Sequence, residues 1–280
     1  MILSNAVTVI IPCYNDGQYI MQALQSIYNQ TVLPESIIIV DDGSNNQTQT
    51  ILKKIKHPLV TIIRQENQGV SVARNSAIAL AKTEYIVNLD ADDYYEPTFI
   101  EKAVAVLQTN AMVGMVSSYC RAFSNNNTME VIKPGGGTIT DFIVINNGRA
   151  AAMFRKSCWE QVGGFDEQML DGYEDWEFWI AITKHDWSMQ IIPEILSHYR
   201  IKKSSRDRTA LINHDFELRQ YIFNKHKDIY LANFEFYSSE LLRQNSLLRT
   251  SVKNAKESPE YLIGETILAP FRFFKKRLIK

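Results

Sequence analysis

The chain has 280 residues and a mass of 32.2 kDa, and 45% of its residues are hydrophobic and 22% charged. This composition is typical of folded globular proteins and excludes a largely disordered chain. Thirty basic and 31 acidic residues leave a net charge of −1, so the overall charge gives no reason to expect a nucleic-acid partner.

The cysteines and the N-terminal residues indicate the cellular compartment of the protein. Cys13, Cys120 and Cys158 lie far apart and suit neither a disulfide framework nor a zinc site, which favours a reducing compartment. The first residues lack a basic segment and run directly into a strand pattern, so we expect no signal peptide. No stretch reaches the ~18 consecutive apolar residues that a membrane-spanning helix needs. We therefore expect a soluble chain, or one that contacts only a membrane surface.

The first 120 residues alternate between short β-rich segments and helical segments. Strands are predicted over residues 7–12, 36–42, 59–65, 84–89 and 112–118. Helices are predicted over residues 16–29, 48–55, 70–82 and 97–109. Apolar strands separated by helices predict a largely parallel sheet that is covered on both faces.

The pattern changes after about residue 120. The turn-rich residues 124–138 predict a hairpin or a mobile loop. Helices are predicted over 158–162 and 174–185, and strands over 188–192 and 195–201. The chain beyond Arg208 is almost wholly helical in pattern. Within it, Leu241, Leu248, Val252 and Ala255 have heptad-like spacing, which fits ordinary helix packing or a homodimer formed through the C-terminal helices.

Polar residues follow three of the predicted strands, where open α/β sheets bind their ligands. They occupy residues 13–16 after the first strand, 41–44 after the second and 90–93 after the fourth. Helix capping can explain one residue of each group. It does not explain several carboxylates at one edge, because their mutual repulsion must be offset by a cation or by hydrogen-bond donors.

The Asp90-Ala91-Asp92 segment is the candidate metal site. In an extended segment, side chains two residues apart lie on the same side, so the two carboxylates can act together. Such hard oxygen ligands suit Mg²⁺ or Mn²⁺. The chain has neither a GxGxxG fingerprint nor a Walker A sequence, which argues against a hydride-transfer enzyme and a P-loop ATPase.

Four segments, in order, resemble family 2 glycosyltransferases, which are inverting enzymes with the GT-A fold. They cover about residues 6–200 and read VTVIIPCYND, VDDGS, NQGVSVARNSAIALAKTEYIVNLDADD and FRKSCWEQVGGFDEQMLDGYEDWEFW. The resemblance implies an α/β, Rossmann-like, mostly parallel central sheet flanked by helices, with a helical C-terminal extension. It also implies a metal-dependent enzyme that transfers a sugar from a nucleotide-diphosphate donor to a hydroxyl of a glycan or lipid-linked acceptor in bacterial surface polysaccharide. The expected donor is a UDP-sugar, although thymine would present the same imide.

The resemblance also implies roles for single residues. The residues expected to contact the nucleotide donor are Pro12, Tyr14, Asn15, Asp41, Asp42, Arg74, Asp90 and Ala91. Asp92 would bind the divalent metal directly, and Asp90 would contact the ribose or a metal-bound water. Many relatives carry a His a few residues after a Tyr-Arg pair. Here that position holds Lys202, so we expect Lys202 and Arg206 to contact the diphosphate instead.

Asp175 would be the catalytic base that takes the proton of the acceptor hydroxyl, a role worth typically ~10²–10⁴ in rate. It also opens a predicted helix, where a carboxylate is favoured by the dipole whether or not it is catalytic. Two alternatives stay open. A sugar-nucleotide pyrophosphorylase usually has a Gly-rich, Arg- or Lys-bearing loop after the first strand, which this chain lacks. A non-catalytic scaffold of the same fold would be expected to lose Asp92 or Asp175, and both are present.

We divide the chain into a catalytic domain over residues 1–205 and a helical region over 206–280. Residues 1–118 would bind the nucleotide, and 119–205 would bind the acceptor. The segment 264–280 is basic and amphipathic, which predicts contact with an anionic membrane surface or a helix packed on the domain with a solvated basic face. The expected location is therefore cytoplasmic, with peripheral binding at the inner face of the plasma membrane as an option.

Overall fold

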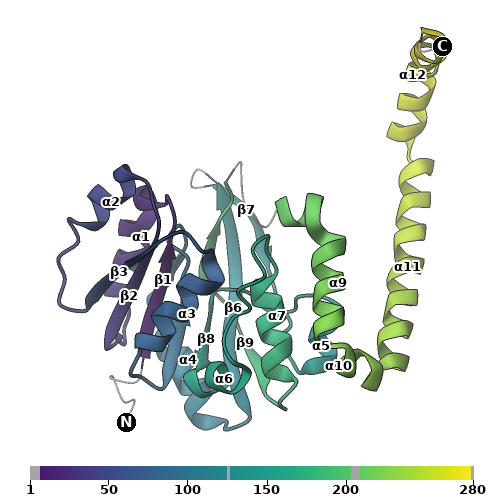
Figure 1. Cartoon of the computed structure of the whole chain (residues 1–280). Helices are drawn as coiled ribbons and strands as arrows, with labels where there is room; N and C mark the ends of the chain where they lie inside the picture. Colours follow the sequence, from purple (N-terminus) through teal and green to yellow (C-terminus); the bar gives the residue numbers. More distant parts are fainter. Residues whose placement is uncertain (1–6, 125–126, 203–208, 279–280) are drawn as a thin grey trace. The chain divides into compact units, whose positions relative to one another are not determined.

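The computed structural model describes residues 7–124, 127–202 and 209–278 (Figure 1). Its side chains are described as far as residue 268, apart from residue 128. The chain divides into two compact units, Met1–Ala232 and Asn233–Lys280, and each is treated by itself below. The division lies further along the chain than the boundary at 205 that the sequence suggested, because Ala210, Leu218 and Ile222 belong to the hydrophobic core of the preceding sheet and helices.

The N-terminal half of the first unit alternates strands with helices as predicted. Its strands are β1 (Val7–Cys13), β2 (Ser36–Asp42), β3 (Val60–Gln65), β4 (Tyr85–Asn88) and the two-residue β5 (Tyr94–Tyr95). Its helices are α1 (Gly17–Tyr28), α2 (Asn46–Leu52), α3 (Val70–Leu80) and α4 (Phe99–Thr109). The apolar residues of α1 recur at helical spacing, and Ile20, Leu24 and Ile27 are buried as that spacing predicts.

The second half of this unit mixes strands with short helices. Its strands are β6 (Val113–Ser124), β7 (Asn127–Ile132), β8 (Ala152–Arg155) and β9 (Ser188–Arg200). Its helices are α5 (Ile139–Phe142), α6 (Lys156–Val162), α7 (Glu174–Thr183), the π-helix η1 (Ala210–His214), α9 (Asp215–Lys225) and α10 (Lys227–Ala232). The second compact unit consists of α11 (Phe234–Glu257) and α12 (Pro259–Leu278).

One mixed sheet has the strand order β3-β2-β1-β4-β8-β6-β9-β5, with β7 paired to β6. The strands β3, β2, β1 and β4 are parallel, so their carboxyl ends meet at one edge. The strand β8 runs antiparallel to both β4 and β6, and β9 is parallel to β6. This arrangement confirms the expected α/β sheet and adds antiparallel strands in its second half.

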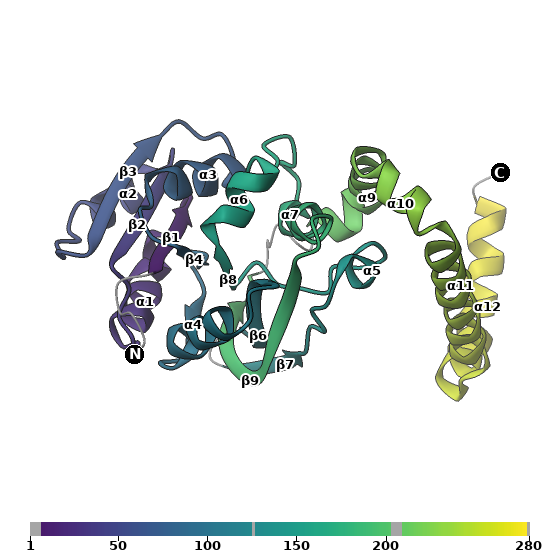
Figure 2. The ribbon, with the colours of Figure 1, turned by 90° about the horizontal axis from the view of Figure 1, so that it is seen from below.

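Helices cover both faces of the sheet. Figure 2 shows α1 and α4 on one side and α3 and α6 on the other. The strand β1 serves both layers, because Val9 and Ile11 pack in the core of α1 and α4, whereas Ile10 packs in the core of α3 and α7. The side chains of Val9, Ile10 and Ile11 are all fully buried.

The structure differs from the sequence prediction in two local details. The two strands predicted over 188–192 and 195–201 form the single strand β9, and irregularities in its pairing with β6 absorb the intervening residues. The short strands β5 and β8 were not predicted, because segments of two and four residues are too short to show a period. The hairpin predicted as one option for the turn-rich segment 124–138 is confirmed: β6 and β7 pair antiparallel, with Cys120 opposite Ile132.

Candidate functional site

The carboxyl ends of the parallel strands border a cavity of about 400 Å³, which we name the strand-end cavity. It brings together most of the predicted donor-binding residues, namely Pro12, Tyr14, Asp42, Asp90, Ala91, Asp92 and Lys202. They come from three strand ends and from the segment after β9, so the sheet topology explains their meeting. Half of the Tyr14 side chain is exposed, which leaves its ring available at the cavity.

Asp42 organises one wall of the strand-end cavity. Its buried carboxylate accepts hydrogen bonds from Gln65 Nε2 (2.8 Å) and from the backbone N–H groups of Gln68 and Gly69 (3.0 Å each). The next residue, Gly43, has a φ of +73°, and a Cβ there would lie 2.6 Å from the backbone N of Asn67. The Asp-Gly pair therefore holds the loop that supplies Asn67 and Gly69 to the cavity.

Asp41 and Asn15 are not among the residues that border the strand-end cavity. Successive side chains of a strand face opposite ways, and Asp41 borders a separate hollow beside α2. Its carboxylate accepts a 2.9 Å hydrogen bond from the backbone N of Ser44 and lies 3.6 Å from Arg64 Nε. The Asn15 side chain accepts from the backbone N of Asn45 (2.8 Å), which joins the two strand-end turns.

Lys202 lies between two carboxylates at the strand-end cavity. Its Nζ is 2.8 Å from Asp92 Oδ2 and donates to Asp16 Oδ1 and Oδ2 at 2.9 and 3.1 Å. Burial alone would lower the pKa of Lys202, but Asp92 and Asp16 outweigh it and raise that pKa. Burial raises the pKa of Asp92 in spite of the nearby ammonium. The contact with Asp16 was not foreseen from the sequence, and Arg206 lies outside the described residues.

Arg74 borders an adjoining cavity, described below, and joins two acidic residues. Its guanidinium donates to Asp90 Oδ1 and Glu174 Oε1, each at 2.8 Å, and to Asn88 Oδ1 at 3.1 Å. The Arg74 side chain is only 1% exposed, so its charge is desolvated. Burial opposes that charge, but Asp90 and Glu174 more than compensate and raise the pKa of Arg74. The resemblance predicts Arg74 near the diphosphate or the nucleotide-binding rim; its described partners are two protein carboxylates and an amide.

A second cavity of about 270 Å³ lies at the N-terminus of α7, and we name it the α7 pocket. It shares Asp90 and Tyr199 with the strand-end cavity, so the two cavities adjoin. Asp175 borders the α7 pocket together with Trp176, whose Nε1 donates to the Phe142 carbonyl at 2.7 Å. The predicted base thus lies in a neighbouring hollow and not in the strand-end cavity itself.

Asp175 is held by local contacts at the start of α7. Asn146 Nδ2 donates to Asp175 Oδ2 (3.1 Å), and the backbone N of Trp176 donates to Asp175 Oδ1 (2.8 Å). The preceding Tyr173 has a φ of +61°, a left-handed conformation that turns the chain into the helix. The first turn of α7 also contains Glu174 and Glu177, and the helix dipole favours such carboxylates.

Several residues of the α7 pocket were missed by the sequence prediction. Asn146 and Arg149 come from the segment before β8, and Arg219 comes from α9. The Arg149 guanidinium lies 4.9 Å from the Tyr199 ring centroid, and that of Arg219 lies 4.8 Å from the Trp176 ring. No local spacing links these residues to Asp175, because the segment before β8 and α9 reach the pocket only through tertiary packing.

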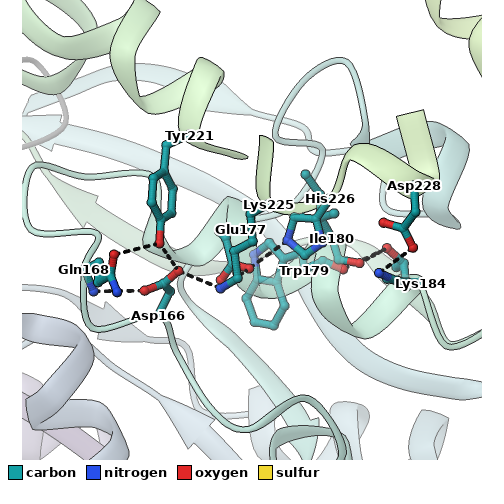
Figure 3. A network of polar contacts seen from close by, with 11 residues as sticks. Asp166, Gln168, Glu177, Trp179, Ile180, Lys184, Tyr221, Lys225, His226 and Asp228 are labelled. Carbon is teal, nitrogen blue, oxygen red and sulfur yellow. Dashed lines mark hydrogen bonds and ion pairs between the residues drawn. The ribbon is translucent and has the colours of Figure 1, made fainter. Parts of the chain in front are cut away.

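A polar network fastens α9 and α10 to α7 (Figure 3). Lys225 Nζ and His226 Nε2 both lie 2.8 Å from the same oxygen of Glu177, which is 1% exposed. Lys225 also contacts Asp166 Oδ2 at 2.6 Å, and Lys184 pairs with Asp228 at 2.7 Å. The segment that contributes Arg219 to the α7 pocket is therefore attached to the helix that carries Asp175.

Two other polar residues serve the packing. Burial raises the pKa of Cys13 to about 12, so its thiol is a poor nucleophile and fits the role of a buried filler. His198 is buried, stacks on the Tyr94 ring at 4.2 Å, and contacts Glu96 Oε1 at 2.7 Å. Burial lowers the pKa of His198, which favours its neutral form.

The donor atoms at the strand-end cavity fit a divalent cation. Asp90 and Asp92 both border it, and their carboxylate oxygens are the hard ligands that Mg²⁺ and Mn²⁺ prefer. Within the described ranges, no three His, Cys, Asp or Glu side chains gather into a metal-binding group. A cation here would therefore take one or two carboxylates from the protein and its other ligands from phosphate oxygens and water.

Comparisons with known proteins found similar sequences among glycosyltransferases. A chondroitin synthase of Pasteurella multocida (strain Pm70) is 26% identical over 264 residues, covering 79% of this chain and 26% of that protein. The putative teichuronic acid biosynthesis glycosyltransferase TuaG of Bacillus subtilis (strain 168) is 25% identical over 202 residues, covering 71% of this chain and 80% of TuaG. This chain likewise spans 26% of the chondroitin synthase of Escherichia coli, so it corresponds to a part of such enzymes.

A solved structure and a family model complete the comparison. The crystal structure of Staphylococcus aureus TarS 1–349 in complex with UDP-GlcNAc matches with a TM-score of 0.67 and 20% identity, covering 92% of this chain and 77% of that one. This likeness confirms the expected GT-A type of fold. The model of the family described as "Glycosyl transferase family 2" matches residues 8–161, which include the three strand ends that border the strand-end cavity. With more than half of its length matched, the chain belongs to glycosyl transferase family 2.

Proposed function

We propose that this chain is an inverting, metal-dependent glycosyltransferase of the hexosyltransferase type. It transfers a sugar from a nucleotide-diphosphate donor, a UDP-sugar, to a hydroxyl of a glycan or lipid-linked acceptor in surface polysaccharide synthesis. The observation that carries this proposal is the junction of the two cavities at Asp90 and Tyr199. A donor in the strand-end cavity and an acceptor in the α7 pocket would meet there, with Asp175 on the acceptor side.

The strand-end cavity would hold the nucleotide. Pro12 and Tyr14 offer an apolar surface and an exposed ring for the base, and the loop that Asp42 anchors closes that wall. Lys202 offers a cation for the diphosphate, and Asp92 with Asp90 would hold Mn²⁺ or Mg²⁺, which neutralises charge on phosphate oxygens when bound. The structures of TarS with UDP and with UDP-GlcNAc support a nucleotide-sugar donor for this fold.

Asp175 would act on the acceptor. Inversion requires the acceptor hydroxyl to attack the anomeric carbon from the face opposite the leaving diphosphate, and a carboxylate on that side can take the hydroxyl proton. Asn146 orients one oxygen of Asp175, and Glu174 beside it is neutralised by Arg74. Asp175 lies in the first turn of α7, where the helix dipole favours a carboxylate.

Membrane contact and self-association are the proposed roles of the second compact unit. The α11 side chains of Leu241, Leu248 and Val252 are exposed within the structure as described, which leaves the heptad-like face available for a second copy of the chain. The side chains from residue 269 onward, which carry the basic charges of the segment 264–280, lie outside the described side chains. No described helix has both the length and the hydropathy to cross a bilayer.

Calorimetric titration of the full chain with UDP, with and without Mn²⁺, tests the proposal. We expect UDP to bind and Mn²⁺ to strengthen that binding, whereas adenosine diphosphate should bind more weakly because its base lacks the imide. If UDP gives no heat of binding either with or without Mn²⁺, the proposed donor is wrong. A screen of UDP-sugars for UDP release would then identify the sugar.

A further inference from the structure

The position of Lys202 has a consequence for how the metal and the donor bind. Its ammonium group contacts Asp92 Oδ2 at 2.8 Å and both carboxylate oxygens of Asp16 at 2.9 and 3.1 Å. All three residues border the strand-end cavity. We name this arrangement the Lys202 bridge.

The Lys202 bridge is a specific contact and not a surface ion pair. The side chains of Lys202, Asp16 and Asp92 are 30%, 22% and 13% exposed, so much of their charge is removed from water. Asp16 is the N-cap residue of α1, where an Asp side chain normally accepts a helix N–H, but this carboxylate makes no such cap. It contacts the ammonium instead, which draws Lys202 toward the cavity.

A divalent cation and the ammonium of Lys202 need the same carboxylate. Asp90 is the neighbouring carboxylate, and its Oδ1 already accepts from Arg74. Asp92 is therefore the better candidate ligand, and its Oδ2 is in contact with Lys202. A second positive charge beside this ammonium would be repelled, so the two cations compete until an anion enters the cavity. The diphosphate of a nucleotide is such an anion.

We propose that Lys202 guards Asp92 in the donor-free enzyme, and that Asp92 becomes available to a divalent cation only when the donor diphosphate draws Lys202 away. This inference rests on the proposed function. It assigns Lys202 a positioning role that couples two binding events, in addition to contact with the diphosphate. Because coupling free energy is reciprocal, UDP must raise the affinity for Mn²⁺ by the same factor as Mn²⁺ raises the affinity for UDP.

The electron paramagnetic resonance signal of free Mn²⁺ measures this coupling directly. We expect the full-length protein to bind Mn²⁺ at least tenfold more weakly without UDP than with saturating UDP. Lys202→Met should bind Mn²⁺ alone at least fivefold more tightly than the wild type and should bind UDP more weakly. Lys202→Arg keeps the charge and should resemble the wild type with Mn²⁺ alone. Lys102→Met, which removes an exposed lysine paired with Glu194, is the matched control.

The possible failures are distinguishable. Absence of UDP binding to the wild type, measured by calorimetry, would overturn the proposed function. UDP binding with equal Mn²⁺ affinity in its presence and absence would overturn only the guarding role. The guarding role is also overturned if Lys202→Met, or Lys202→Gln where the Met variant does not melt cooperatively, shows no gain in affinity for Mn²⁺ alone.

Discussion

Arg74 and Glu174 form an ion pair 2.8 Å long between side chains that are 1% and 3% exposed, although the two residues lie 100 positions apart in the chain. The same guanidinium also holds Asp90, which borders both cavities. One buried cation thus connects the end of β4 with the first turn of α7. This connection joins Asp90 to the helix turn that carries Asp175.

Removal of Arg74 should be strongly destabilising. Arg74→Met leaves the Glu174 carboxylate buried without this partner, which typically costs about 3–5 kcal/mol of unfolding free energy. Urea unfolding measures the loss, and the double variant Arg74→Met/Glu174→Gln should recover part of it because it removes the buried negative charge of Glu174. Lys102→Met, at an exposed pair, should change the free energy by less than about 1 kcal/mol. Equal losses for Arg74→Met and the double variant would show that Glu174 is not the source of the penalty.

Asp175→Asn should separate catalysis from donor binding. The amide keeps the shape of the side chain but cannot take a proton, so transfer should fall about 10²–10⁴-fold. UDP affinity should stay near that of the wild type, because Asp175 borders the α7 pocket and not the strand-end cavity. UDP release with the active donor, together with UDP calorimetry, measures both quantities. Transfer at the wild-type rate would rule out Asp175 as the base.

The adjacent residues Asp41 and Asp42 provide a matched pair for donor binding. Asp42→Asn places an amide against donors from Gln65, Gln68 and Gly69, so the loop should loosen and UDP affinity should fall about tenfold. Asp41→Asn changes a residue beside the separate hollow at α2 and should leave UDP affinity within about twofold. Calorimetric titration compares them. A larger effect for Asp41→Asn would mean that the wrong carboxylate has been assigned to the donor.

Acid should weaken the contact between α9 and the segment that precedes α7. Burial tends to raise the pKa of Asp166, but hydrogen bonds from Lys225, the Gln168 backbone and Tyr221 outweigh it and lower that pKa. A carboxyl group with a lower pKa in the folded state adds stability above its unfolded pKa of ~3.9 and loses it as the pH falls through the folded pKa. Between pH ~5 and ~3, Tm should therefore fall more steeply for the wild type than for Asp166→Asn. The exposed neighbour Asp171, changed to Asn, should leave the wild-type slope, and three parallel curves would refute the contribution of Asp166.

Membrane contact should depend on the C-terminal segment. The full chain should sediment with vesicles that contain anionic lipid, and a chain ending at residue 263 should stay in the supernatant, because the basic residues of the segment 264–280 are then absent. Vesicles of neutral lipid serve as the control and should bind neither chain. If both chains sediment equally with anionic vesicles, this segment is not the membrane contact.

Local patterns predicted much of the fold. The strand and helix segments of the first half appear in the structure within a few residues of their expected bounds, because their apolar residues follow periods of two and 3.6. The meeting of Pro12, Asp42 and Asp92 at one cavity also follows from the sequence, since parallel strands end at the same edge. The strand β8 escaped prediction because four residues that reverse direction between β4 and β6 have no local signature.

The sequence by itself determined the family, the parallel strand segments and the carboxylates at their ends. Only the tertiary structure decided which cation each carboxylate meets: Arg74 holds Glu174, and Lys202 reaches Asp16 across 186 positions of the chain. It also decided that α9 contributes Arg219 to the pocket of Asp175. The physical reason is that hydrophobic periodicity is a local property of the chain. The partner of a buried charge, in contrast, depends on which distant side chains lose their water together when the layers pack.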